Sequence, residues 1–426
     1  MSERITQPRL AFVGDDFTGS TDALESLALA GAKATLFTYT PTAEDLAARP
    51  GLHAFGIATM TRSLPPPAME SVLRSLYSAL EALRVPIVHY KVCSTFDSST
   101  TTGSIGRAID VGLNIFGSRP VPIVAGTPAI GRYCVFGNLF ARHGSQSWPF
   151  RIDRHPSMCR HPITPMSEAD LRVHIGKQTT EAIGLLDLFA LRRGDTLPFD
   201  SETVQLIDTL EDADVDHVGT LLADLRSRLL PARSMYVVGS STVETAVGRS
   251  WNLPHAELPA AQKAAGPIIA VCGSCSPATT SQIRYAQQRG FEVMSGRPGR
   301  IDTQGLMRCV AALREGRSVV LHSDADRRLE PELAAQLNPT LASLTVEMVS
   351  EVTGIRRILL AGGDTSGQVA HALGVRSIEV EARLVRGVPL CRVTSQHAAI
   401  NGIEMAFKGG QMGGEDFFCV VRDGIH

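Results

Sequence analysis

Leu10-Ala11-Phe12-Val13-Gly14 is an apolar run typical of a buried strand, and Asp15-Asp16-Phe17-Thr18-Gly19 follows it directly. A helical pattern of leucines begins at once, over Ser20–Ala30. Open α/β sheets bind their ligands at such strand-to-helix turns, at the carboxyl ends of parallel strands. The turn therefore predicts a parallel sheet and a polar ligand near Asp15 and Asp16.

A second turn of this kind lies near the other end of the chain, at Gly362-Gly363-Asp364-Thr365-Ser366-Gly367. It follows the apolar run Ile358-Leu359-Leu360 and precedes a helical pattern that includes Val369 and Leu373. Glycines leave backbone N–H groups open to close approach, and a helix N-terminus favours negative charge. This turn therefore predicts phosphate binding.

Apolar runs and helical patterns alternate along most of the chain, which is the βαβ pattern of parallel sheets covered by helices. We expect two α/β domains, each a mostly parallel sheet flanked by helices, with the active site in the cleft between them. The expected strands are Leu10–Gly14, Ala34–Tyr39, His53–Ala58, Pro86–Val92, Pro120–Ala125, Met235–Gly239, Pro267–Cys272, Phe291–Met294, Ser318–His322, Arg357–Ala361 and Leu390–Val393.

The best candidate for a linker is Asn252–Ala265, which has two prolines, a run of small residues and no strong strand signal. We expect an N-terminal domain over residues 1–251, a linker over 252–266 and a C-terminal domain over 267–426. A second irregular stretch, Trp148–Pro165, is rich in proline, arginine and histidine. We interpret it as a long loop of the first domain, since such loops are often functional.

The composition of the chain excludes several classes of protein. The 426 residues are 44% hydrophobic and 20% charged, which is ordinary for a folded globular protein. The formal net charge of -2 provides no basic field, so binding to nucleic acid or to an anionic membrane is not expected. No secretory leader or long apolar segment stands out, so we expect a cytoplasmic protein. The residues leave the oligomeric state open, a homodimer included.

Eight cysteines are scattered over the chain, too sparsely for a disulfide framework. Only Cys272-Gly273-Ser274-Cys275 has the spacing of a redox pair or half a zinc site. No second pair completes four zinc ligands, and metal ligands stay unknown. The alternative is a small-residue turn, in which Gly273, Ser274 and Ser276 allow close backbone approach to a ligand.

The N-terminal half offers candidates for binding a polar substrate. Asp15 could accept hydrogen bonds from substrate hydroxyls, and Asp16 could also receive a proton. The alternative is an N-cap for the following helix, although a cap needs only one carboxylate. Arg62, just past the strand His53–Ala58, could hold a carboxylate with its planar fork, or could be an ordinary surface arginine.

A second polar cluster follows the strand Pro86–Val92. Lys91 could neutralise a substrate carboxylate or a transferring phosphoryl group, and we expect it to be catalytic together with Asp16. Hydroxyl and carboxylate groups in the same segment could form hydrogen bonds with the hydroxyls of the substrate. The alternative is a solvent-exposed turn, which uses similar residue types. The further substrate-binding residues expected are Ser94, Thr95, Asp97 and, in the proline-rich loop, His161.

The C-terminal half offers candidates for nucleotide binding. Three small-residue turns could bring backbone N–H groups and hydroxyls to phosphates. Asp364 could hold Mg²⁺, which prefers oxygen ligands. The residues expected at the nucleotide are Gly273, Ser274, Ser276, Gly362, Gly363, Asp364, Thr365 and Gly410. The chain contains no Gly-x-x-x-x-Gly-Lys-[Ser/Thr] loop.

Six stretches in the same order resemble the four-carbon acid sugar kinase family over nearly the whole chain. They are Val13–Gly19, Lys91–Ser98, His161–Met166, Gly273–Ser276, Gly362–Ser366 and Lys408–Phe418. The resemblance implies an ATP-dependent kinase that phosphorylates the 4-hydroxyl of threonate, erythronate or 3-oxo-tetronate. It also implies an N-terminal domain for the acid sugar and a C-terminal domain for the nucleotide.

Within that family, Cys93-Ser94-Thr95-Phe96-Asp97-Ser98 is more similar to the 3-oxo-tetronate branch than to the threonate branch. The sequence departs from that branch over Thr100–Gly106, which leaves the exact substrate open. Two other classes stay as alternatives. A NAD-dependent dehydrogenase would show Gly-x-Gly-x-x-Gly after its first strand, where this chain has two acids. A non-catalytic sugar-acid-binding protein would not need the glycine-rich turns of the second half.

Overall fold

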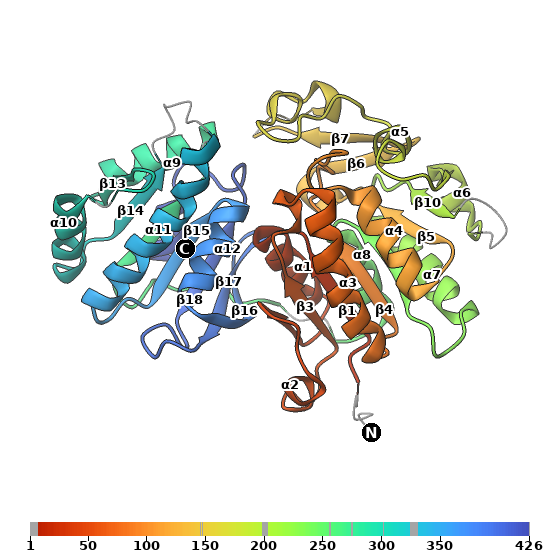
Figure 1. Ribbon diagram of the computed structural model, residues 1–426, viewed down its shortest axis with the longest axis horizontal. Coiled ribbons are helices and arrows are strands. Elements are labelled where there is room, and N and C mark those ends of the chain that lie inside the picture. The colour runs from red at the N-terminus through yellow and green to blue at the C-terminus, as the bar shows by residue number, and fades with distance from the viewer. Residues whose placement is uncertain are drawn as a thin grey trace. The chain divides into compact units, whose positions relative to one another are not determined.

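The computed structural model describes residues 7–144, 146, 148–197, 203–254, 257–273, 276–300, 302–323 and 331–425, without the side chains of 331–335. The chain divides into two compact units, Met1–Ala256 and Glu257–His426. Figure 1 colours unit 1 from red to green and unit 2 from green to blue. Among the described residues, no helix is both long and apolar enough to cross a membrane.

Unit 1 is built on a sheet in which every neighbouring pair of strands runs parallel. In spatial order the strands are β2 (Ala34–Phe37), β3 (Ala54–Ala58), β1 (Leu10–Gly14), β4 (Ile87–Lys91), β11 (Met235–Gly239), β5 (Val121–Val124), β10 (Val204–Ile207) and β9 (Ile183–Leu186). The chain reverses direction across the sheet at β1, since β2 and β3 lie on one side of it and β4 on the other. Open α/β sheets bind ligands at such a switch point.

Helices cover both faces of this sheet. On one face, α1 (Phe17–Leu29) packs beside α8 (Thr242–Ser250), and α8 packs beside α7 (Asp212–Arg228). On the other face, α3 (Pro66–Ala82) packs beside α4 (Ile105–Phe116). The shorter helices of the unit are α2 (Ala43–Ala47), α5 (Leu171–Gly176) and α6 (Leu188–Arg193).

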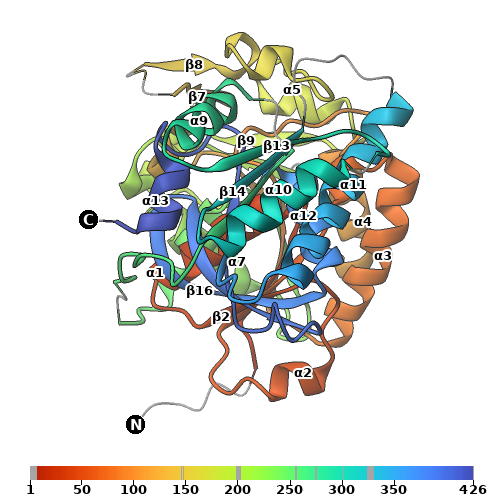
Figure 2. The ribbon, with the colours of Figure 1, turned by 90° about the vertical axis from the view of Figure 1, so that its left-hand side faces the viewer.

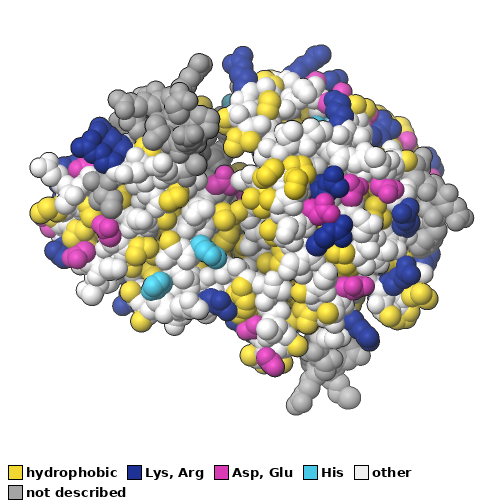
Figure 3. All heavy atoms as spheres, in the orientation of Figure 1, with side chains coloured by type: hydrophobic (Ala, Val, Ile, Leu, Met, Phe, Trp, Pro, Cys, Tyr) yellow, Lys and Arg dark blue, Asp and Glu magenta, His cyan; other side chains and the backbone are white. Residues whose placement is uncertain are grey.

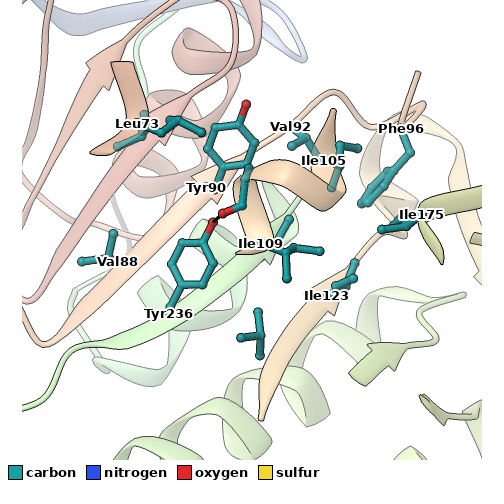
Figure 4. Packing of buried hydrophobic residues seen from close by; sticks show 14 of the residues in the cluster. Leu73, Val88, Tyr90, Val92, Phe96, Ile105, Ile109, Ile123, Ile175 and Tyr236 are labelled. Atoms are coloured by element: carbon teal, nitrogen blue, oxygen red, sulfur yellow. Dashed lines mark hydrogen bonds between the residues drawn. The ribbon is translucent and has the colours of Figure 1, made fainter. Parts of the chain in front are cut away.

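The main core of unit 1 lies between the sheet and the helices α3 and α4. Figure 4 shows Leu73 of α3 and Ile109 of α4 packed around Tyr90 of β4 and Tyr236 of β11. These four side chains are buried, and such apolar burial on both faces explains why the strands read as continuous apolar runs. The hydroxyl of Tyr236 donates to the carbonyl of Ala108 at 2.9 Å, so the buried phenol has a partner.

A small antiparallel sheet follows the carboxyl end of β5. Its strands are β6 (Arg132–Val135), β7 (Asn138–Arg142) and β8 (Pro149–Arg151), in that order. The sequence did not predict this sheet, and β8 lies inside the stretch Trp148–Pro165 that we interpreted as a loop. Apart from β8 and two short 3₁₀ turns, the described part of that stretch has no regular structure.

The sheet of unit 2 is mixed. In spatial order its strands are β13 (Glu292–Gly296), β14 (Val319–Ser323), β12 (Ile268–Cys272), β15 (Arg357–Ala361), β18 (Glu404–Lys408), β17 (Val388–Ser395) and β16 (Val375–Val385). The first five run parallel, whereas β17 pairs antiparallel with both β18 and β16. The expectation of two α/β domains with mostly parallel sheets is confirmed.

Helices also cover both faces of the sheet of unit 2. One face carries α10 (Thr303–Arg314), α11 (Pro331–Glu351) and α12 (Gly363–Ala372), and Figure 2 shows α10 and α11 side by side. The other face carries α9 (Pro277–Gln288) and α13 (Phe417–Asp423), which contact each other. On the visible surface, basic and acidic side chains are interspersed, in keeping with the small net charge (Figure 3).

Candidate functional site

In unit 1, predicted site residues meet at the carboxyl ends of the neighbouring strands β3, β1 and β4. Asp15 directly follows β1, Lys91 ends β4, and Arg62 lies in the 3₁₀ turn after β3. The backbone N–H of Asp15 donates to the carbonyl of Lys91 at 2.9 Å, and the N–H of Arg62 donates to the carbonyl of Asp15 at 3.1 Å. The parallel sheet therefore brings together residues that are up to 76 positions apart in the sequence (91 − 15 = 76).

The Arg62 guanidinium binds both acids of the first turn. Its Nε donates to Oδ2 of Asp15 at 3.0 Å and its Nη2 to Oδ1 of Asp15 at 2.7 Å, which is a bidentate pair. Its Nη1 donates to Oδ2 of Asp16 at 2.9 Å. In this structure the fork of Arg62 therefore faces carboxylates of the protein, and its predicted contact with a substrate carboxylate stays a prediction.

Asp16 caps helix α1. Its Oδ1 accepts from the backbone N–H of Gly19 at 2.7 Å, and its Oδ2 accepts from the hydroxyl of Thr18 at 2.7 Å. Burial acts to raise the pKa of Asp16, but the charge of Arg62 and these hydrogen bonds hold that pKa below its usual value. Asp16 is thus an ionised carboxylate whose two oxygens already have donors.

The pKa of Asp15, in contrast, is shifted above its usual value. Burial raises its pKa, the neighbouring charge of Asp16 adds to the rise, and Arg62 only partly offsets it. Two adjacent carboxyls are therefore driven apart in acidity, which is a common arrangement where one of them exchanges a proton with a substrate.

The Lys91 amine lies beside the start of helix α1 and is 1% exposed. It donates to the carbonyl of Val92 at 2.9 Å and lies 3.9 Å from Oδ2 of Asp22. A Cβ at Gly19 would lie 2.7 Å from Oδ1 of Asp16 and 3.0 Å from this amine. A side chain at residue 19 would therefore collide with the carboxylate of Asp16 and crowd the amine of Lys91.

The segment after Lys91 forms a hydrogen-bonded chain of polar groups. The hydroxyl of Thr95 donates to Oδ1 of Asp97 at 2.6 Å, and the hydroxyl of Thr164 donates to Oδ2 of Asp97 at 3.4 Å. The backbone N–H of Thr164 donates to Nδ1 of His161 at 3.1 Å, so a neutral His161 carries its proton on Nε2. The structure thus brings Thr95, Asp97 and His161 together, while Ser94 is half-buried in the same segment.

In unit 2, the predicted glycine turns lie at the ends of the neighbouring strands β12 and β15. Gly362 has a φ of 108°, a conformation that favours glycine, and α12 begins at Gly363 with Asp364 in its first turn. A Cβ at Gly273 would lie 1.8 Å from the hydroxyl oxygen of Thr365, which donates to Oδ1 of Asn338 at 2.7 Å. Gly273 and Thr365 are therefore in close contact.

The third small-residue turn, Gly409-Gly410, contacts this group of residues through Ser276. Ser276 caps helix α9, and its hydroxyl also donates to the carbonyl of Gly410 at 2.5 Å. Ser274 lies outside the described residues, so its predicted role stays a prediction. Cys275 also lies outside them, and Cys272 is a buried thiol whose pKa burial raises to about 12.

Lys408 is a residue of this site that the sequence reasoning did not select. Its buried amine donates to the hydroxyl of Thr279 at 3.2 Å and to the carbonyls of Gly409 at 3.1 Å and Gly410 at 3.4 Å. Burial lowers its pKa from 10.5 to about 8. The signal was a lysine at a strand end directly before two glycines, which is a pattern suited to phosphate.

Two families match the chain, one in each unit. A family described as a sugar-binding N-terminal domain matches residues 10–247, and one described as a nucleotide-binding C-terminal domain matches residues 269–418.

Characterised relatives match over nearly the full length. A 3-oxo-isoapionate kinase of Paraburkholderia graminis is 37% identical, over 97% of this chain and 94% of its own. A 3-oxo-tetronate kinase of Pseudomonas fluorescens is 30% identical, over 97% of this chain and 96% of its own.

Solved structures share the fold. A Salmonella typhimurium protein described as a tRNA synthase superposes with a TM-score of 0.72 at 22% identity, over 96% of this chain and 98% of its own. A Haemophilus influenzae protein superposes with a TM-score of 0.67 at 20% identity, over 97% of this chain and 99% of its own. At these identities the likeness concerns the fold alone.

Proposed function

We propose, from the premise that this chain belongs to the four-carbon acid sugar kinase family, that unit 1 holds an acid sugar and unit 2 holds ATP for phosphorylation of the 4-hydroxyl. The protein is a kinase of sugar acids. The observation that carries the proposal is the cluster of buried Asp15, Asp16 and Lys91 with half-buried Arg62 at the switch point of a parallel sheet. Asp16 also caps helix α1, but a cap needs only one carboxylate, and buried charges beyond that need are typical of functional sites.

The cluster supplies what a hydroxyl nucleophile needs. In this proposal Asp15 accepts the proton of the 4-hydroxyl, because its raised pKa makes it the better proton acceptor of the two acids. Arg62, which also binds Asp16, holds Asp15 in place, and the Lys91 amine lies near enough to stabilise negative charge that develops on transfer. The sequence favoured Asp16 for the proton, whereas the opposite directions of the two pKa shifts favour Asp15.

The turns of unit 2 fit the phosphates of a nucleotide. Gly273 and Gly362 leave no side chain over the start of α12, and the amine of Lys408 lies among the carbonyls of the third turn. ATP, when bound, supplies the phosphoryl group, and Mg²⁺ would neutralise its phosphates. We assign Asp364, in the first turn of α12, as the residue that would hold Mg²⁺.

The names of the relatives narrow the substrate class. Both act on 3-oxo acids of sugars. The Cys93–Ser98 segment supports the same class for this chain, since its motif resembles the 3-oxo-tetronate branch. We therefore propose a 3-oxo sugar acid as substrate, and the cytoplasm, where ATP is available, as the compartment.

The proposed boundaries follow from the same division. Residues 1–251 form the acid-sugar-binding domain, 252–266 the linker and 267–426 the nucleotide-binding domain. The gap between the two family matches, from residue 248 to 268, supports a linker there.

ATP consumption against a panel of acids tests the proposal. With Mg²⁺, we expect turnover of 3-oxo-tetronate or 3-oxo-isoapionate well above that of threonate and erythronate. Oxidation or reduction of a nicotinamide cofactor, or acid binding without ATP consumption, would contradict it and favour a dehydrogenase or a binding protein.

A further inference from the structure

Arg132 opens strand β6, just past the carboxyl end of β5, and its guanidinium is anchored on one side only. Its Nη1 donates to the carbonyls of Ile130 at 3.1 Å, Gly131 at 3.3 Å and Arg142 at 3.2 Å. Its Nε is buried and has no hydrogen-bond partner within the described part of the chain. Buried donors are nearly always paired, so an unpaired guanidinium N–H points to a missing acceptor.

In Arg132 the unpaired edge is formed by Nε and Nη2, and in other arginines of this chain the same two atoms bind carboxylates. Nε and Nη2 of Arg62 bind Asp15, and the same pair of atoms binds a carboxylate in Arg172 and in Arg192. Nη1 is the donor in all the side-chain hydrogen bonds of Arg132, so its Nε and Nη2 edge faces no protein acceptor among the described residues. The shape of this edge suits a carboxylate.

A second unpaired donor lies beside it. The hydroxyl of Thr127 is buried and has no hydrogen-bond partner among the described residues. Thr127 pairs with Arg132 in an antiparallel bridge, so their side chains leave the ladder on the same face. Two buried donors without acceptors thus lie together at the carboxyl end of β5.

This place is electrostatically connected to the cluster of unit 1. Burial lowers the pKa of Arg132, while Cys93 and Asp22 act to raise it. Cys93 also acts on Arg62, and Asp22 lies 3.9 Å from the amine of Lys91. Arg132 therefore shares its charged neighbours Cys93 and Asp22 with Arg62 and Lys91 of that cluster.

We propose that Arg132, through Nε and Nη2, binds the carboxylate of the acid sugar, and that the hydroxyl of Thr127 donates to the same group. The inference rests on the proposed function and assigns its carboxylate site. The sequence alone pointed to Arg62 for this task, but the matching edge of Arg62 holds Asp15. Arg62 thus positions the carboxylates of Asp15 and Asp16, whereas Arg132 binds the carboxylate of the substrate.

Calorimetric titration of the full chain with 3-oxo-tetronate and with its primary amide tests this inference. The unmodified chain should prefer the acid over the amide. In Arg132→Ala, affinity for the acid should fall roughly 10- to 150-fold, the equivalent of a lost charged hydrogen-bonded contact, while affinity for the amide changes little. Arg132→Lys keeps the charge without the two-pronged edge and should recover only part of the preference.

Arg193→Ala is the matched control, because Arg193 is an exposed arginine that holds Asp195 on the surface. It should leave both affinities and the melting temperature unchanged. Retention of the full preference for the acid in Arg132→Ala and Arg132→Lys, with the acid still bound, would overturn the inference alone. Failure of the unmodified chain to bind the acid would overturn the proposed substrate class as well.

Discussion

The parallel strands of the two units present different chemical groups at their carboxyl ends. In unit 1 the strand ends present charged side chains, with half-buried Arg62 paired to buried Asp15 and Asp16 and with buried Lys91 close by. In unit 2 the strand ends present glycines, hydroxyls and a helix N-terminus, with Lys408 as the buried cation. A small polyhydroxy acid is distinguished by side chains that match its groups, whereas phosphates suit backbone N–H groups. The contrast predicts that substitutions in each unit act on one substrate at a time.

The largest effect is expected from Asp15→Asn. If Asp15 accepts the proton of the hydroxyl, kcat should fall by about 10²–10⁴ while KM for ATP stays near its original value. Steady-state kinetics with both substrates varied would measure this. Asp16→Asn is the matched control, since asparagine caps a helix about as well as aspartate.

Asp16→Asn should therefore keep most of the thermal stability and lose less of kcat. The reverse ranking, with the larger loss of kcat in Asp16→Asn, would restore the assignment made from the sequence and reject Asp15 as the proton acceptor.

The next effect concerns the glycine turn of unit 2. In Gly273→Ala the new Cβ would lie 1.8 Å from the hydroxyl oxygen of Thr365, so the turn must shift. We expect ATP affinity to fall by about tenfold or more and stability to fall by about 1–3 kcal/mol, with acid-sugar affinity nearly intact. Calorimetry with each ligand would measure the difference.

Gly176→Ala serves as the comparison, because a Cβ at Gly176 meets nothing within 4 Å. Equal losses for ATP and acid sugar in a folded Gly273→Ala protein would contradict the division of tasks between the units.

A smaller, pH-dependent effect is expected from Lys408. Its pKa is lowered to about 8 from 10.5, so the unfolded chain binds more protons between these values and unit 2 should gain stability as pH rises through that range. Phosphates favour the charged amine, so ATP binding should take up a proton above pH 8 and weaken by up to about tenfold per pH unit. Titrations at pH 7 to 9.5 would show this slope. The slope should disappear in Lys408→Met, and its persistence there would assign it to another group.

The smallest effect is expected from Thr127→Val. Because the hydroxyl of Thr127 is buried without a protein acceptor, its removal should leave the free energy of unfolding unchanged within about 0.5 kcal/mol, or raise it. Affinity for 3-oxo-tetronate should still fall by about fivefold, the loss of one hydrogen bond. A clear fall in the melting temperature with unaltered affinity would give Thr127 a purely structural role.

The sequence predicted most of the parallel strands, because strands buried on both faces leave a continuous apolar run such as Leu10–Gly14, but it missed the parallel strands β10 and β18. It missed the whole of the antiparallel β16, where Arg376, Glu379 and Arg383 interrupt the apolar residues in the alternation of a half-exposed strand. It also missed the edge strand β9, whose residues are mostly half-buried.

The residues of the candidate site were predictable where a charged side chain directly follows or ends a predicted strand. Asp15, Asp16 and Lys91 stand directly at strand ends, so their placement followed from the strands. Arg132 could not be found in this way, since its unpaired Nε arises only when β6 folds against Arg142 of the neighbouring strand β7. Likewise, the bidentate contact of Arg62 with Asp15 joins residues 47 positions apart, and no local pattern encodes it.

The central claim is that the chain transfers a phosphoryl group from ATP to the 4-hydroxyl of a 3-oxo sugar acid. Phosphorus NMR of a reaction with ATP, Mg²⁺ and 3-oxo-tetronate tests it most directly. We expect one new phosphomonoester signal, split by the methylene protons of carbon 4, that grows in step with ADP. Release of inorganic phosphate without that signal, or a phosphomonoester on another carbon, would contradict it.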